Sequence, residues 1–412
     1  MKRKFLYFII TLFVSLYSTV SSVRAAEGVI LDKKIIKIGL LGPLTGSFQK
    51  IGECFADGMK AYLEQLNAKG GMGGFKFELI AYDNNNDPIL IKNVIEKIVK
   101  KDKVFAVVGC IGGINVNIII KELINYGIPV IHPVGGDYDW VVRPKRNIFT
   151  VQPDYFTEGY LMVKFALLNL KAKRIAFVCN DDGVIGTSYL KGADKAMEEI
   201  GKKLGASVVL KMARNPLSIR LEVAIKKLKE VKPDVTILAD FLINVAGVIN
   251  GANRSGIQTK WVTSCINGDD IMYKMCGKAW LGVYVSGWIK RAGDNFENFI
   301  NYFNSTDYHR KALANYWRSP SGFHASGWIA CEIFFGGLKI FYRKYKNMEL
   351  LDREKFIESM EKMRNFNDTL AKDITYLPLA VTEEGASDYY RTRRGQSSMY
   401  FSVASLSPKK EF

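Results

Sequence analysis

The stretch from Ile35 to Pro88 limits the possible folds of this chain more than any other part of its 412 residues. It begins with a short, mostly apolar run, Ile35 to Leu41, of the kind that forms a parallel strand covered by helices on both faces. Gly42-Pro43 ends this run, and apolar residues then recur at helical spacing up to Leu66. A glycine-rich turn and a second strand follow, and Asp87-Pro88 has the form of an N-cap and first helical residue. This order predicts an α/β fold.

Several short motifs occur together in and after this stretch: Gly42-Pro-Leu-Thr-Gly46, Gly52, Gly58, Leu66-Asn67 with Gly70-Gly71, and Asp83 with Asp87-Pro88. In this combination they resemble the start of the leucine/isoleucine/valine-binding family of periplasmic receptors for ATP-driven importers. The resemblance continues through Val107-Val108-Gly109 and Gly127-Ile-Pro-Val-Ile to about Gly287, becomes thin, and returns at Met399 to Val403. It implies two Rossmann-like three-layer α/β/α domains joined by a three-strand hinge, the type I periplasmic binding protein fold.

The chain is expected to cross between the two domains three times. A second strand-and-helix series begins after Asn147 to Gln152, and the resemblance predicts a second crossing at Gly282 to Gly287 and a third near Ile374 to Pro378. The expected N-terminal lobe is 34–150 plus 289–372, and the expected C-terminal lobe is 151–287 plus 379–405. Ser321 to Phe341 predicts a long helix with aromatic core residues. Three adjacent crossings form a hinge about which the lobes can close over a ligand.

Residues 1–25 have the features of a cleaved signal peptide. Lys2, Arg3 and Lys4 form a positive n-region, Phe5 to Val20 is apolar, and Val23-Arg24-Ala25 is a small-x-small cleavage pattern. We expect cleavage before Ala26 and a mature protein in the periplasm. The alternative is an uncleaved N-terminal anchor, for which the apolar stretch is short.

The sequence is basic, with a formal net charge of +17. The leader holds four basic residues and no acid, so residues 26–412 carry 17 − 4, or +13. Such a charge raises the hypothesis of nucleic-acid binding. Export argues against that hypothesis, and the bases alternate with acids in segments such as Lys226 to Glu230 and Glu358 to Arg364, as on a solvated surface. No nucleic-acid partner is predicted. Tyr389 to Gly395 is a basic, aromatic loop. We interpret it as a solvated turn before the final strand, and the alternative is a docking surface for a partner.

The residue types that usually take part in catalysis or metal binding form no recognisable catalytic motif. The six cysteines are scattered, and the bridge of the resembled family is expected to be absent, because Cys110 fits one of its positions and Asn84-Asn85-Asn86 covers the other. Three histidines lie far apart, and phosphate-loop, dinucleotide and zinc-protease motifs are missing. We predict no enzyme activity, no cofactor and no metal. Asp181-Asp182 and Asp269-Asp270 are either paired carboxylates or, as we expect, helix N-caps.

Two glycine corners follow predicted strands of the first domain, where ligands of parallel sheets sit, although an ordinary turn also needs glycine. His132, inside the strand before the second corner, is expected to be a packed and satisfied residue and not a catalyst. With the resemblance, the predicted ligand contacts are Thr45, Ile51, Gly112, Gly113, Val134, Gly135, Gly136, Ile185, Asp240, Phe241 and Cys265.

The predicted contacts depart from the resembled family at its charged anchor. Cys265 stands where the family has an acid for the ligand's ammonium group, and side-chain hydroxyls are missing at both glycine corners. Asp240 or Asp137 could replace the acid. A less polar ligand, an organic acid or amide, therefore fits the sequence as well as an amino acid does.

The functional hypothesis is an extracytoplasmic solute-binding protein of an ABC importer. It would bind a branched-chain or hydrophobic amino acid, or a related small organic solute, in the interdomain cleft by hinge closure, act as a monomer and deliver the solute to a membrane permease. One alternative is a ligand-sensing receptor subunit of the same fold for an organic acid or amide. A periplasmic hydrolase is the second.

Overall fold

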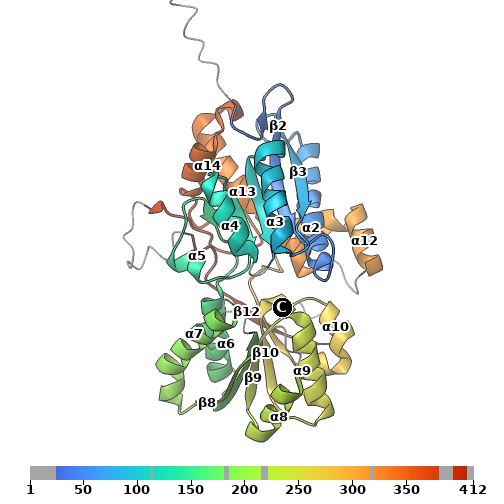
Figure 1. The fold of residues 1–412 in the computed structure, drawn as a ribbon, viewed down its shortest axis with the longest axis vertical. Coiled ribbons are helices and arrows are strands. Elements are labelled where there is room, and N and C mark those ends of the chain that lie inside the picture. The colour runs from blue at the N-terminus through green and yellow to red at the C-terminus, as the bar shows by residue number, and fades with distance from the viewer. Residues whose placement is uncertain are drawn as a thin grey trace, which may run out of the picture.

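The computed structural model describes residues 25–112, 115–180, 185–214, 221–315, 320–379 and 393–405. These residues form an upper and a lower lobe stacked along the long axis of the molecule (Figure 1). Each lobe has a central sheet of six strands, mainly parallel, with helices packed on it, so the predicted α/β class with two Rossmann-like domains is confirmed. The predicted signal peptide lies outside the described residues except for Ala25.

The upper sheet has the order β1-β2-β4-β5-β6, and β3 pairs with β2. The apolar run predicted as the first strand forms β2, which pairs in parallel with β3 on one side and with β4 on the other. The strands are β1 (Val29–Ile30), β2 (Ile35–Gly42), β3 (Lys76–Asp83), β4 (Ala106–Ile111), β5 (Val130–Val134) and β6 (Ile148–Phe149). The helices in the first part of this lobe are α2 (Gln49–Ala68), α3 (Pro88–Glu96) with its π-helical continuation (Lys97–Asp102), α4 (Asn115–Asn125) and α5 (Asp139–Val142).

Later residues complete the upper lobe. They form α11 (Asp294–Asn304), α12 (Asp307–Asn315), α13 (Gly322–Tyr345), a 3₁₀ turn (Met348–Leu350) and α14 (Arg353–Met360). Ser321 caps α13 by accepting from the backbone N–H of His324, and the predicted aromatic residues of this helix are buried in one core with β2 and β4. Helices α2 and α13 pack backbone to backbone, because a Cβ on Gly58 would lie 2.0 Å from the carbonyl oxygen of His324 and one on Gly327 would lie 2.0 Å from that of Phe55.

The lower sheet has the order β12-β11-β10-β9-β7-β8, in which only β12 is antiparallel to its neighbour. The strands are β7 (Arg174–Asn180), β8 (Ser207–Arg214), β9 (Val235–Ala239), β10 (Lys260–Thr263), β11 (Tyr284–Gly287) and β12 (Tyr400–Val403). The helices are α6 (Tyr155–Leu168), α7 (Ile185–Ala196) extended by π (Met197–Gly201) and 3₁₀ (Lys202–Leu204) turns, α8 (Leu221–Val231), α9 (Leu242–Arg254), η4 (Cys265–Asn267), α10 (Ile271–Cys276) and η5 (Gly277–Trp280).

Gln396 joins the segments that connect the lobes. Its backbone N–H donates to the carbonyl oxygen of Val151 at 2.9 Å, and its side-chain amide donates to that of Trp288 at 3.0 Å. Ile374 and Tyr376, in the predicted third crossing, are packed in the core of the upper lobe, and the Tyr376 hydroxyl donates to the carbonyl oxygen of Thr150 in the first crossing at 2.6 Å.

The basic loop before β12 is partly buried. Tyr389 to Thr392 lie outside the described residues, but the Arg393 side chain is fully buried against Glu361, and Arg394 pairs with the buried Asp154. The prediction of a solvated turn is therefore wrong for Arg393, whose charge is matched by an acid more than thirty residues away in sequence.

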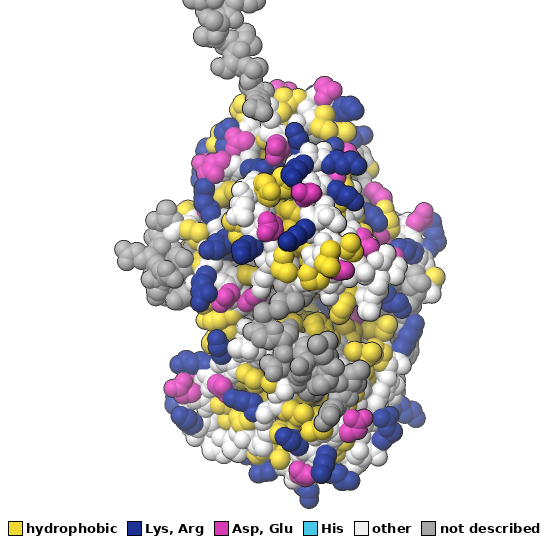
Figure 2. Space-filling model, viewed as in Figure 1, with side chains coloured by type: hydrophobic (Ala, Val, Ile, Leu, Met, Phe, Trp, Pro, Cys, Tyr) yellow, Lys and Arg dark blue, Asp and Glu magenta, His cyan; other side chains and the backbone are white. Residues whose placement is uncertain are grey.

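On the face drawn in Figure 2, Lys and Arg side chains alternate with Asp and Glu over both lobes. Among the described residues, no helix combines the length and the apolar composition needed to cross a membrane.

Candidate functional site

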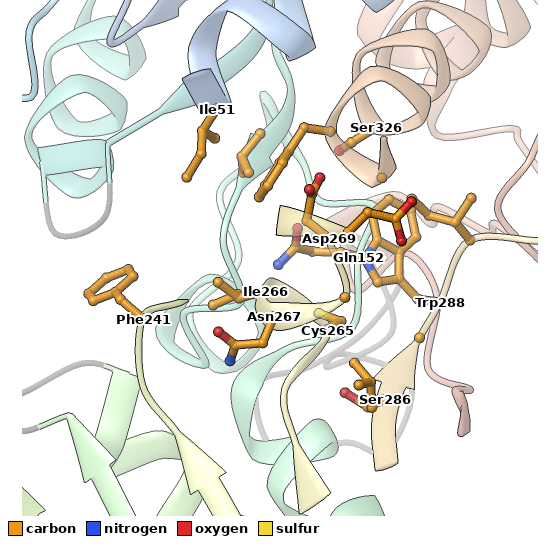
Figure 3. Close-up of a pocket in the computed structure, with 18 of the residues that line it drawn as sticks. Ile51, Gln152, Phe241, Cys265, Ile266, Asn267, Asp269, Ser286, Trp288 and Ser326 are labelled. Atoms are coloured by element: carbon orange, nitrogen blue, oxygen red, sulfur yellow. The ribbon is translucent and has the colours of Figure 1, made fainter. Parts of the chain in front are cut away.

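A cavity of about 400 Å³ lies between the lobes and takes its walls from both of them and from the connecting segments (Figure 3). Its upper wall includes Ile51, Val134 and Ser326, and its lower wall includes Phe241 and η4. Gln152 and Trp288 line it from the connecting segments. The strands of the upper lobe point their carboxyl ends at this cavity, which explains why the glycine corners after β4 and β5 border it.

Seven of the eleven predicted ligand contacts line this one cavity. They are Ile51, Gly112, Val134, Gly135, Ile185, Phe241 and Cys265. Gly113 lies outside the described residues. Thr45, Gly136 and Asp240 do not border the cavity.

Three predicted contacts that do not border the cavity form hydrogen bonds within the protein. The Thr45 hydroxyl donates to Asp83 at 2.6 Å, which holds the loop after β2 to the end of β3. Asp240 accepts from the backbone N–H of Phe241 at 2.7 Å, and the Gly136 carbonyl oxygen accepts from the N–H of Tyr155 at 2.6 Å. The other suggested acid, Asp137, accepts from Asn117 at 2.7 Å and is not a lining residue.

An aromatic pair spans the cleft beside the cavity. The ring of Phe48, the residue before α2, lies edge-on to that of Phe241, with 5.9 Å between the ring centroids. Phe241 was predicted from the sequence, but Phe48 was not. Phe48 precedes the apolar periodicity of α2, so only its position in space shows that it faces the other lobe.

His132 lies behind the upper wall. It is fully buried, and its Nε2 atom is 2.8 Å from the Oγ atom of Ser326, which borders the cavity. Burial lowers the pKa of His132 to about 3, so the ring is neutral near neutral pH. Its backbone has φ of 55°, a left-handed conformation that is uncommon for residues other than glycine. The prediction of a packed histidine is confirmed, but the prediction that it is satisfied is wrong for Nδ1, which is buried and has no hydrogen-bond partner among the described residues.

The lower wall contains a buried carboxylate network. Glu158, on α6, is 1% exposed and accepts from the backbone N–H of Cys265 at 2.9 Å and from the hydroxyls of Ser286 and Tyr189. Cys265 and Ser286 border the cavity, so Glu158 lies directly behind them. Glu158 was not predicted as a site residue, because in the sequence it is only one charged residue within a predicted helix.

Acidic residues also occur at one end of the cavity. Asp269 and Asp270 both border it, and Asp269 accepts from the backbone N–H of Ile271 at 3.0 Å, whereas Asp270, which occupies the N-cap position of α10, makes no side-chain capping hydrogen bond. Burial, with the charge of Asp270, raises the pKa of Asp269. Asp181-Asp182 lie outside the described residues. Among the residues that are described, no three His, Cys, Asp or Glu side chains form a group suited to a metal ion.

None of the six cysteines, all of which lie in the described part of the chain, forms a disulfide bond. Cys110 is fully buried, and burial raises the pKa of its thiol, so it packs as a small apolar side chain.

Comparison with known proteins gives consistent results. The sequence model of a family described as "Periplasmic binding protein" matches residues 35–397. A curated relative, the Leu/Ile/Val-binding protein BraC3 of Rhizobium johnstonii, is 28% identical over 200 residues, which are 48% of this chain and 53% of that protein. The match thus spans about half the length of that relative.

Solved structures show the same fold. A possible leucine/isoleucine/valine-binding protein from Rhodopirellula baltica aligns with a TM-score of 0.73 at 16% identity, covering 91% of this chain and 95% of the other. A fatty acid ABC transporter substrate-binding protein from Thermomonospora curvata also aligns with a TM-score of 0.73, at 18% identity, covering 93% and 91%. At these identities the likeness establishes the fold, and the names of the two proteins refer to different solutes.

Proposed function

Because the chain belongs to the periplasmic binding protein family, we propose that it is the extracytoplasmic solute-binding protein of an ATP-driven importer. The observation that carries the proposal is the cavity between the lobes, which takes its walls from both lobes and from the segments that connect them. A cavity of about 400 Å³ falls within the usual range of small-molecule sites, about 300 to 1,000 Å³. The proposed activity is binding, not catalysis.

The proposed solute is a small organic molecule with an apolar body, such as a hydrophobic amino acid or an analogue. Ile51, Val134, Ile185 and Phe241 supply apolar contacts from the two lobes. A solute that touches both lobes favours the closed arrangement, because it gains its full set of contacts only there. The closed form is the one that a membrane permease would recognise. The names of the relatives, which include Leu/Ile/Val-binding proteins, support this choice of solute.

We further propose that the protein is exported to the periplasm after cleavage before Ala26 and acts as a monomer. The export and cleavage rest on the basic and apolar pattern of residues 1–25.

Small-angle scattering combined with a thermal-shift panel tests the proposal. The panel contains amino acids, amides, aliphatic and aromatic carboxylates, and sugars. We expect one class to raise the melting temperature and to reduce the radius of gyration. A solute at a hundredfold excess over its dissociation constant adds about 2.7 kcal/mol of stability. If a solute saturates the protein but leaves the scattering curve unchanged, a hinged receptor is the wrong description.

A further inference from the structure

The order of the lower sheet sets the length of the cavity. Phe241 follows β9, η4 follows β10, Trp288 follows β11, and Tyr400 begins β12, which runs antiparallel and therefore starts at the same edge of the sheet. All four positions line the cavity, and in Figure 3 Phe241 and Trp288 lie on opposite sides of η4. Neighbouring strands are about 4.8 Å apart, so the distance across the sheet from β9 to β12 is about 14 Å. The cavity therefore continues well past the contact predicted at Phe241.

Half-buried aromatic side chains line the part of the cavity beyond η4, which we call the aromatic chamber. Tyr273 on α10 and Tyr400 on β12 belong to the lower lobe, and Phe296 on α11 and Phe323 on α13 belong to the upper lobe. A group placed in the aromatic chamber would thus contact both lobes. None of these residues is among the contacts predicted from the sequence.

The tyrosines of the aromatic chamber present ring surfaces, because their hydroxyl groups have partners in the protein. The Tyr400 hydroxyl donates to the carbonyl oxygen of Ile289. The Tyr273 hydroxyl donates to the carbonyl oxygen of Ser405 at 3.2 Å and accepts from the backbone N–H of Ser405 at 3.1 Å. What these side chains offer a solute is therefore apolar contact and the edge or face of a ring.

The charged residues that line the cavity lie beside the aromatic chamber. They are Asp269, Asp270 and Arg291. Burial raises the pKa of Asp269, and the charge of Arg291 opposes that rise, so these two side chains offset each other. Arg291 is exposed, and its Nη2 atom is 3.9 Å from the position that a Cβ on Gly322 would take. The aromatic chamber therefore ends near solvent, at Gly322 and Arg291.

We propose that the aromatic chamber is a second subsite, which takes the terminal aromatic ring of a solute longer than a branched-chain amino acid. The inference rests on the proposed receptor function and specifies the size and shape of its solute. A water molecule's share of liquid volume is about 30 Å³, so a cavity of about 400 Å³ has room for about 13 groups of that size. Leucine has fewer non-hydrogen atoms than this and, when held at Phe241, would leave the aromatic chamber unfilled. A phenyl ring on a flexible chain would reach the chamber and cover apolar surface of both lobes.

Two series of solutes with increasing length test the inference. Calorimetry on the full mature protein would compare 4-methylpentanoate with 3-phenylpropanoate, 4-phenylbutanoate and 5-phenylpentanoate, and would compare L-leucine with the 2-amino derivatives of the same phenyl acids. We expect the affinity to rise about threefold to fourfold per added methylene group in at least one series, because each group is removed from water. The longest solute of that series should bind about tenfold or more tightly than its branched-chain member.

Variants assign the effect of length to the aromatic chamber. Gly322→Leu should lower the ratio of the affinities of the longest and the branched-chain solute about tenfold, because the new side chain occupies the chamber. Apart from its chain neighbours, a Cβ on Gly322 would lie no closer than 3.9 Å to any described residue, so the substitution has room. The ratio is the informative quantity, because general loosening of the cavity would weaken both solutes.

Phe323→Ala provides the same reading if Gly322→Leu does not fold. Phe323 lines the aromatic chamber but belongs to none of the apolar cores of the described residues, so its loss removes ring contact at little cost in stability. The affinity ratio should decrease about twofold to tenfold. Phe366→Ala is the matched control, because Phe366 is also a half-buried phenylalanine of the upper lobe but does not border the cavity.

The outcomes separate this inference from the receptor function. An affinity that is highest for leucine or 4-methylpentanoate and decreases with length would overturn the second subsite but would still demonstrate a receptor. A preference for long solutes that neither Gly322→Leu nor Phe323→Ala reduces would overturn the placement of the ring in the aromatic chamber. A protein that closes only on a solute without an apolar chain or ring, such as a sugar, would also overturn the inference and leave the receptor function standing. A protein that closes on no solute at all would overturn both proposals.

Discussion

Loss of Glu361 should destabilise the upper lobe strongly, because it would leave Arg393 buried without an anion. The Arg393 side chain is 0% exposed, that of Glu361 is 6% exposed, and 2.7 Å separates Nη2 from Oε1. Removing one partner of a buried ion pair typically costs about 3 to 5 kcal/mol. Arg393 would keep its bonds to the carbonyl oxygens of Arg146 and Leu377 and its position over the Phe149 ring. We therefore expect Glu361→Leu to cost about 3 kcal/mol, the lower end of that range.

Thermal unfolding measures this cost, which corresponds to a decrease of about 6 to 12 °C for a domain of this size. The control is Glu354→Leu in α14, the helix for which Glu361 is the C-cap residue. Glu354 pairs with Arg146 at the surface, where its side chain is 61% exposed, and such pairs contribute less than about 1 kcal/mol. Equal melting temperatures for the two variants would refute the reasoning. A double-mutant cycle with Arg393→Met would then show whether the pair is coupled at all.

Four further outcomes follow from the structure. Phe241→Ala should weaken solute binding by about 1 to 3 kcal/mol in calorimetry, through loss of apolar contact and of the ring pair with Phe48; unchanged affinity would exclude Phe241 from the solute contact. Gly327→Ala should lower the free energy of unfolding by about 1 to 3 kcal/mol in urea titrations, because the new methyl group would force α2 and α13 apart; a neutral result would show that the helices can separate freely. The pKa of His132 is about 3 in the folded state, below its usual value, so the unfolded state binds the proton first as the pH falls. Stability should therefore decrease from about pH 6.5 toward pH 3, by up to about 1.4 kcal/mol per pH unit from this group, and His132→Asn should make the slope shallower in urea titrations. N-terminal sequencing of the secreted protein should begin near Ala26, and retention of Met1 would contradict a cleaved signal peptide.

The fold was largely predictable because its determinants are local. The strand from Ile35 and the cap at Asp87 depend on neighbouring residues, and Asp87 does accept from the backbone N–H of Ile89 at 2.8 Å. The apolar period of the segment after Ser321 likewise depends on side chains within a few turns of each other. Such patterns are visible in a single sequence, because the helix and strand periods fix which residues share a face.

The site was only partly predictable because it joins residues from distant parts of the chain. The glycine corners could be found, since parallel strands bring their carboxyl ends to one edge. Glu158 could not, because its partners Cys265 and Ser286 follow 107 and 128 residues later. A glutamate in a helix usually faces solvent, and only the packing of α6 against the lower sheet removes it from water. The burial of Arg393 was not predicted for the same reason, because its partner Glu361 lies 32 residues away in the sequence.

The segment from Ser286 to Trp288 links solute contact to the movement of the lobes. At one end, Ser286 borders the cavity and donates to Glu158 in the lower lobe. At the other end, the carbonyl oxygen of Trp288 accepts from Gln396, and its ring lies edge-on to His132 of the upper lobe with 5.7 Å between the centroids. A solute held at Ser286 would therefore contact one end of a crossing segment, and one that also contacts Ser326 would reach, through the 2.8 Å contact of Ser326 with His132, the strand against which Trp288 packs. Because the wall and the hinge share these residues, a substitution at Ser286 should alter closure together with affinity.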